Sequence, residues 1–107
     1  MPSPLTTYAY YAYTSRVGFE WDGRKRSQNL RDHGIDFTEA REVFDDPLAI
    51  IRPDPDRSRT EHRFIIVGRT KKHRMLLTVF VESDTEIRII STRRATRREV
   101  RDYEEGV

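Results

Sequence analysis

A cluster of arginines lies near the end of the chain, at the junction between a predicted strand and a predicted helix. The segment 88–98 contains five arginines and no acidic residue: Arg88, Arg93, Arg94, Arg97 and Arg98. A guanidinium group presents a planar set of donors that fits phosphate or carboxylate in two-point contacts. The cluster therefore favours an anionic partner, and phosphate in particular. The alternative is a solvated helix end without a ligand.

Strand periodicity adds further arginines to this basic surface. Because successive side chains of a strand alternate between faces, Arg63 and Arg69 should share one face of their strand. By the same rule, Arg88 should share a face with Thr92. An arginine flanked by isoleucines is costly unless its face opens onto water or an anion. We therefore expect Arg63, Arg69 and Arg88 to line a concave basic face, which Arg93 and Arg94 extend from the corner. Each arginine alone could instead pair with an acid such as Glu61 or Glu86.

Such a face could support cleavage of RNA without a metal ion. The reaction requires removal of a proton from the 2′-hydroxyl, stabilisation of charge on the phosphorus, and protonation of the leaving 5′-oxygen. Arginine stays protonated, so Arg63, Arg88, Arg93 and Arg94 would hold the scissile phosphate. The titratable candidates for proton transfer are His33, His62, Glu61 and Tyr103. His33 could equally interact with the end of its helix, and Glu61 could be only a salt-bridge partner.

Four aspartates offer a competing, metal-dependent interpretation. Asp45, Asp46, Asp54 and Asp56 lie close together in the sequence. However, Asp-Asp-Pro and Pro-Asp-Pro-Asp are more typical of helix ends and turns than of magnesium sites. The chain has no cysteine, which excludes thiolate ligands and disulfides. We therefore predict neither a metal site nor a cofactor.

Length and composition predict one domain whose positive charge is local. A chain of 107 residues can build a single modest core, and its formal net charge is only +2. Residues 1–16 hold four of the five tyrosines and one charge, and we expect a disordered tail or an over-called gene start there. Residues 17–107 remain as the domain. No apolar run reaches the roughly 18 residues that a membrane span needs, so we expect a soluble, cytoplasmic protein.

Three helices are predicted, two before the main strands and one after them. Residues 23–33 form a polar, basic helix that should lie on the surface. The side chains expected to face a partner are Arg24, Lys25, Arg26, Asn29 and Arg31. The second helix should pack on the core through an apolar stripe, which consists of Phe37, Ala40, Val43 and Phe44. Capping boxes mark two of the helix starts: Asp36 with Glu39, and Thr96 with Glu99.

Five strand segments are predicted from apolar alternation and turn residues: 17–21, 48–51, 62–69, 74–82 and 86–92. The links between the last three are short, which favours antiparallel neighbours. Helices precede and follow the main strands rather than separating them. The sequence therefore predicts an α+β domain, in which an antiparallel meander sheet has its helices packed on one face.

Three segments, taken together and in order, resemble a known family. They are FEWDGRKRSQNLRDHGIDFTEAREVFDDP, PDPDRSRTEHRFIIVGRT and EIRIISTRRATRREVRDYEE, and the resemblance covers Gly18 to Glu105. The chain resembles the BrnT family of ribonuclease toxins from type II toxin–antitoxin pairs. The resemblance implies a RelE-like fold, RNA cleavage that arrests translation, and a BrnA-like ribbon-helix-helix antitoxin that binds DNA. An acidic position of the family's pattern is filled here by His62.

With this resemblance, the sequence predicts a metal-independent endoribonuclease that a cognate antitoxin neutralises, with DNA association only through that antitoxin. The predicted catalytic residues are His33, Glu61, Arg63 and Arg88. The predicted RNA- and phosphate-binding residues are Lys25, Arg69, Arg93, Arg94 and Arg97. The alternative is a non-catalytic module that binds nucleic acid or an antitoxin through the same basic surface.

Overall fold

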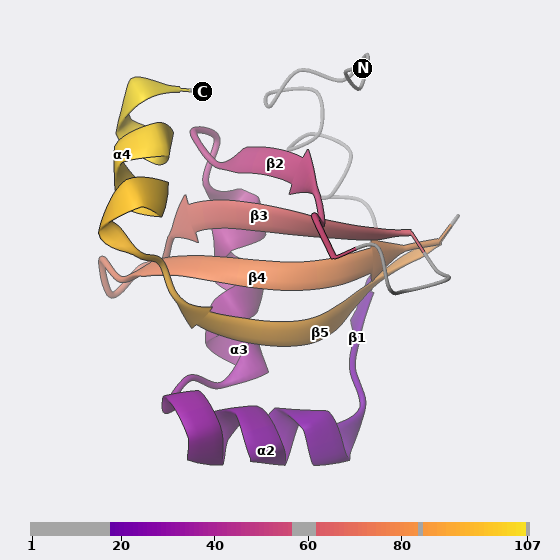
Figure 1. The fold of residues 1–107 in the computed structure, drawn as a ribbon. Helices are drawn as coiled ribbons and strands as arrows, with labels where there is room; N and C mark the ends of the chain where they lie inside the picture. Colours follow the sequence, from indigo (N-terminus) through magenta and orange to yellow (C-terminus); the bar gives the residue numbers. More distant parts are fainter. Residues whose placement is uncertain (1–17, 57–61, 84, 107) are drawn as a thin grey trace.

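A five-stranded sheet forms the centre of the computed structural model, which describes residues 18–56, 62–83 and 85–106 (Figure 1). The strand order is β1-β5-β4-β3-β2. The strands are β1 (Gly18–Glu20), β2 (Ile50–Pro53), β3 (Arg63–Arg69), β4 (Met75–Glu82) and β5 (Glu86–Arg94). The tail expected at residues 1–16 lies outside the described residues.

The sheet is mixed rather than wholly antiparallel. Strands β2 to β5 pair as antiparallel neighbours in chain order, as expected for a meander. Strand β1, in contrast, pairs in parallel with β5, with Phe19 opposite Ile87. This pairing joins two segments far apart in the sequence, so strand alternation alone did not reveal it. The α+β class is confirmed, and the fully antiparallel sheet is corrected to a mixed one.

Helices cover both faces of the sheet. The short helix α3 (Phe37–Ala40) and the 3-10 helix η1 (Arg41–Asp45) lie behind the sheet in Figure 1. Helix α4 (Arg97–Glu105) stands at the left end of the strands in that view and packs on the opposite face through Tyr103. Helix α2 (Gly23–His33) runs along the β5 side of the sheet and contacts that strand. In the part of the chain that the structure describes, no helix is long and apolar enough to cross a membrane.

Two hydrophobic clusters, one on each face of the sheet, show that helices must cover both faces. Behind the sheet, Val43 of η1 packs in a cluster with Ile66, and in front Tyr103 of α4 packs with Val67. Ile66 and Val67 are neighbours in β3, so their side chains point to opposite faces. The expectation of helices on one face is therefore wrong. The central strands are apolar on both sides, and such strands require cover on both sides.

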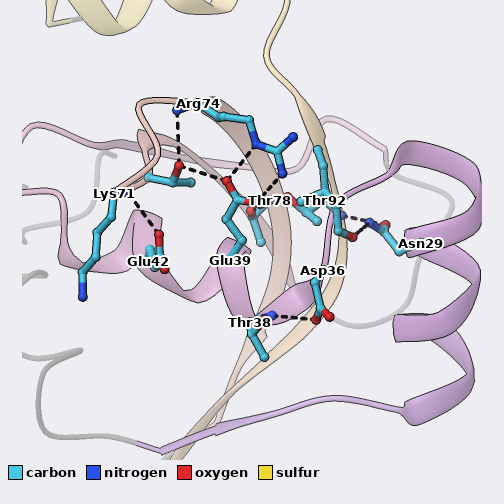
Figure 2. A network of polar contacts seen from close by, with 11 residues as sticks. Asn29, Asp36, Thr38, Glu39, Glu42, Lys71, Arg74, Thr78 and Thr92 are labelled. Atoms are coloured by element: carbon cyan, nitrogen blue, oxygen red, sulfur yellow. Dashed lines mark hydrogen bonds and ion pairs between the residues drawn. The ribbon is translucent and has the colours of Figure 1, made fainter.

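The second predicted helix is irregular. Asp36 caps α3 and accepts a hydrogen bond from the Thr38 amide at 3.0 Å, but regular α-helix ends at Ala40. The expected capping box does not form, because the Glu39 side chain turns inward (Figure 2). The predicted apolar stripe is confirmed as buried core: Phe37, Ala40, Val43 and Phe44.

Glu39 anchors this irregular segment to the turn between β3 and β4. Its carboxylate accepts from Thr70 Oγ1 at 3.0 Å and from Arg74 Nε at 2.9 Å, and Arg74 Nη2 donates to the second oxygen (Figure 2). The hydrogen bond from Arg74 lowers the pKa of Glu39. A buried carboxylate with these partners is satisfied, so Glu39 holds the fold together and is not a candidate for proton transfer.

A β-bulge interrupts the pairing of β4 with β5. Phe80 lies opposite Ile89 and Val79 lies opposite Ser91, which leaves Ile90 as an extra residue. After the bulge, Thr92 points behind the sheet, where its hydroxyl lies 3.0 Å from that of Thr78 (Figure 2). The prediction that Arg88 and Thr92 share a face is therefore wrong, because the inserted residue reverses the alternation.

Helix α4 is held at both ends. The predicted capping box is present: Thr96 Oγ1 accepts from the Glu99 amide at 3.2 Å, and Glu99 Oε1 accepts from the Thr96 amide at 2.8 Å. Near its other end, the Tyr103 hydroxyl donates to Asp46 Oδ2 at 2.7 Å. Burial, followed by this hydrogen bond, raises the pKa of Tyr103.

Acid should destabilise the protein partly through Asp36. Both Asp36 oxygens accept from Arg26 at 2.9 Å, and this lowers the Asp36 pKa from 3.8 to about 2. The resulting stabilisation is present above pH 3.8 and is lost as the pH falls through about 2. Asp36→Asn keeps a capping side chain and removes the charge. We expect a loss of at most about 1 kcal/mol at neutral pH and a flatter decline of stability in acid.

Urea unfolding at a series of pH values measures this effect, and Arg26→Gln is the matched variant from the other side of the pair. An acid decline that stays as steep in Asp36→Asn as in the original protein would contradict the assignment.

Candidate functional site

An open hollow of about 310 Å³ lies between α2 and the strands β3 and β5. Three predicted site residues meet there: Lys25 and His33 from α2, and Arg63 from β3. The remaining lining residues are Gln28, Asn29, Asp32, Ile90 and Ser91. The hollow thus combines two permanent cations with an imidazole, which is the set of groups that phosphate binding and proton transfer require.

Helix α2 presents one polar stripe to this hollow. Asp22 caps the helix by accepting from the Arg24 amide at 2.7 Å, and Gly34 ends it with φ of 71°. Lys25, Asn29 and Asp32 then follow at the spacing of one helix face. This spacing is the signal in the sequence that could have placed Gln28 and Asp32 beside the predicted residues.

Asn29 fastens α2 to the sheet. It is 6% exposed, its Nδ2 donates to the Ile35 carbonyl at 3.0 Å, and its Oδ1 accepts from the Thr92 amide at 3.0 Å (Figure 2). Strand β1 pairs with β5 only as far as Arg88, so Asn29 satisfies a backbone donor on the β5 side that β1 does not cover. The expectation that Asn29 faces a partner is wrong, because its amide is used inside the fold.

The sheet places Arg63 and Arg88 in one cross-strand row. Arg63 lies opposite Val81, and Val81 lies opposite Arg88, so both arginines project from the same face. One strand separates them, which puts their Cα atoms about 10 Å apart. Glu20 of β1 continues the row beside Arg88. The structure thus brings two of the three predicted strand arginines to one face, in a row that also contains the carboxylate of Glu20.

The other predicted basic residues lie elsewhere. Arg69 is at the far end of β3, about 20 Å along the strand from Arg63, and with His73 it lines a different hollow. Arg94 and Arg97 are exposed at the corner between β5 and α4. The structure thus divides the predicted basic face between two ends of the sheet.

Arg93 is engaged in the corner between β5 and α4. Its two terminal nitrogens donate to the Glu99 oxygens at 2.9 and 3.0 Å, and one of them also donates to the Arg94 carbonyl at 3.1 Å. These bonds from Arg93 lower the pKa of Glu99. Arg93 therefore positions the start of α4, and a phosphate would have to compete with Glu99 for it.

Two of the remaining candidates for proton transfer, His62 and Tyr103, are not among the residues that line the hollow. Glu61 lies outside the described residues, His62 is exposed at the start of β3, and the Tyr103 hydroxyl is committed to Asp46. His33 is therefore the imidazole that the structure brings to Arg63 and Lys25.

The aspartates considered as metal ligands act as turn and cap residues. Asp46 Oδ1 accepts from the Leu48 amide and Oδ2 from the Arg69 amide, both at 2.9 Å. Asp54 Oδ1 accepts from the Asp56 amide at 3.0 Å. Within residues 18–56, 62–83 and 85–106, no three His, Asp or Glu side chains are grouped so that they could hold a metal ion.

Comparison with known proteins identifies the family. Residues 21–99 match the family described as "Ribonuclease toxin, BrnT, of type II toxin-antitoxin system". The chain belongs to the BrnT family. The matched range includes Lys25, His33, Arg63 and Arg88, and it ends within α4. This confirms the family resemblance of the sequence and, with it, a ribonuclease toxin of a type II toxin–antitoxin system.

A solved BrnT structure supports the fold. The crystal structure of the Brucella abortus ribonuclease toxin BrnT aligns with a TM-score of 0.60 and 21% sequence identity, covering 76% of this chain and 99% of that one. At this identity the similarity concerns the fold. A comparison with curated proteins gave no match.

Removing the Asn29 amide should detach α2 from the sheet. Asn29→Ala leaves the Thr92 amide and the Ile35 carbonyl without their side-chain partner, which should cost about 1–3 kcal/mol of unfolding free energy. Thermal and urea unfolding measure this loss. Gln28→Ala, one residue earlier and exposed, is the matched control and should change stability by less than about 0.5 kcal/mol. Equal losses in both variants would contradict an anchoring role for Asn29.

Proposed function

We propose that this BrnT-family chain is a metal-independent endoribonuclease and that the hollow between α2 and the sheet is its active site. The observation that carries the proposal is the convergence of Lys25, His33 and Arg63 on one open hollow. These residues come from two elements that are distant in sequence, and their types match the needs of RNA cleavage. Arg88, next in the row beyond Val81, extends the cationic surface across the sheet.

In this mechanism the 2′-oxygen attacks the adjacent phosphorus, the bond to the 5′-oxygen breaks, and the products are a 2′,3′-cyclic phosphate and a 5′-hydroxyl. Arg63 and Lys25 stabilise the negative charge that develops on the phosphate oxygens. His33 transfers a proton at one of the two reacting oxygens. Arg88 holds a neighbouring phosphate of the same RNA strand. Glu61, two residues before Arg63 in the sequence, remains a predicted second proton-transfer group.

The family places this activity in a toxin–antitoxin pair. We infer that cleavage arrests translation in the cytoplasm, that the fold is RelE-like, and that the toxin is neutralised by a BrnA-like ribbon-helix-helix antitoxin. An acidic antitoxin surface would be complementary to the row of Arg63 and Arg88 and to the exposed Arg94 and Arg97. Any association with DNA would come from that antitoxin.

Purified protein should cleave a long RNA in the presence of EDTA. Arg63→Ala should slow cleavage by about 100-fold or more because a charge-stabilising donor is lost. His33→Gln should slow it by about 100-fold or more because a proton-transfer group is lost. Arg88→Ala should weaken RNA binding more than it slows the chemical step. Rates under single-turnover conditions, with circular dichroism to verify folding, provide the measurement.

Arg101→Ala is the matched control, because Arg101 is an exposed arginine of α4 away from the hollow, and it should cleave as the original protein does. Activity that disappears in EDTA and returns with magnesium would rule out metal independence. Tight RNA binding without cleavage by the folded protein would instead favour the non-catalytic binding module.

A further inference from the structure

Asp32 is an acidic side chain in a hollow that otherwise attracts phosphate. It lines the same space as Lys25, Arg63 and His33. Among the described residues it forms no ion pair, and its side chain is exposed to solvent. A carboxylate accepts hydrogen bonds only and repels a phosphate group, so its presence does not fit a surface that binds the RNA backbone alone.

The helix itself gives no structural reason for this carboxylate. Asp32 lies in the last turn of α2, where the helix dipole disfavours a negative charge. One turn earlier stands the neutral Gln28, so no helical ion pair is available there. Asp32 thus keeps a solvent-exposed carboxylate that no ion pair of the described fold uses, and its oxygens are open to a ligand with hydrogen-bond donors.

The base edges of RNA supply such donors, and guanine supplies them in the best arrangement. Guanine presents N1–H and N2–H side by side on its Watson–Crick edge, which matches the two oxygens of one carboxylate. Uracil and cytosine offer a single donor on that edge, and adenine places an acceptor, N1, beside its amino group. Proteins commonly read single-stranded RNA through hydrogen bonds to this edge.

Two neighbours of Asp32 complete a base subsite. Gln28 lies one turn away on the same helix face, and its amide can donate to guanine O6. Ile90, the extra residue of the bulge, brings an apolar side chain to the lining, against which a base can pack. Asn29, in contrast, is unavailable because its amide is committed to Ile35 and Thr92.

We propose that the α2 wall of the hollow is a base-recognition subsite that selects guanine next to the cleaved phosphate. Asp32 accepts from guanine N1–H and N2–H, and Gln28 donates to O6. The proposal rests on the proposed nuclease function and adds its substrate preference. A two-point contact of this kind should favour guanine over the other bases by about 10-fold or more.

The test uses polyuridine strands that carry one guanosine, inosine, adenosine or cytidine. Inosine keeps N1–H and O6 but lacks the N2 amino group, so it tests one of the two proposed bonds. Single-turnover cleavage rates at the substituted position give the preference. The same strands with a 2′-O-methyl group on every nucleotide cannot be cleaved, and their affinities give the preference without the reaction.

We expect the original protein to prefer guanosine, with inosine intermediate, and Asp32→Asn to lose this preference. Glu104→Asn, a matched change of an exposed acid on α4, should retain it. A carboxylate that merely repels the backbone would behave differently, because Asp32→Asn would then strengthen binding of all strands equally and leave their ratio unchanged. That result, or equal treatment of all bases by the original protein, would overturn the proposal.

These measurements distinguish failure of the proposed nuclease function from failure of the base subsite. If no strand is cleaved but the methylated guanosine strand binds best and loses its advantage in Asp32→Asn, the base subsite stands and the proposed cleavage falls. If cleavage occurs without any guanosine preference, the subsite falls and the nuclease function stands.

Discussion

The burial of β4 on both of its faces is the constraint on which the arrangement of the other elements depends. Leu76 and Phe80 are buried behind the sheet and Leu77 in front of it, so each side needs its own cover. Helices α3 and η1 provide one layer and α4 provides the other. Both apolar layers are then occupied, and α2, which carries mainly polar residues, is left to pack along β5.

This position explains the chemistry available to α2. The helix buries a single residue, Asn29, and its attachment relies on hydrogen bonds more than on apolar area. In an amphipathic helix packed on the core, the inner face would consist of apolar side chains such as leucine. Here the inner face keeps Lys25, Asp32 and His33 beside the sheet arginine Arg63. The same weak apolar attachment therefore permits a polar hollow at the border between helix and sheet.

Local signals in the sequence predicted much of this fold. The helix at 23–33 and the capping box of Thr96 are set by contacts between near neighbours, and the structure reproduces them. Contacts between distant segments could not be predicted from such local signals. The parallel pairing of β1, the cover on both faces and the bulge at Ile90 depend on which surfaces meet in space. For the same reason the arginine pattern overestimated the basic face, because it could not show that Glu99 binds Arg93.

The assembly of the hollow from distant segments also has a consequence for synthesis of the protein. The walls of the hollow come from residues 25–33 and from residues 63, 90 and 91, so they span most of the chain. A nascent chain on the ribosome has made α2 long before β5 emerges, and the contacts of α2 with Thr92 are then missing. Non-local pairings of this kind form late. A toxin built in this order cannot assemble its hollow until residues 90 and 91 have left the ribosome.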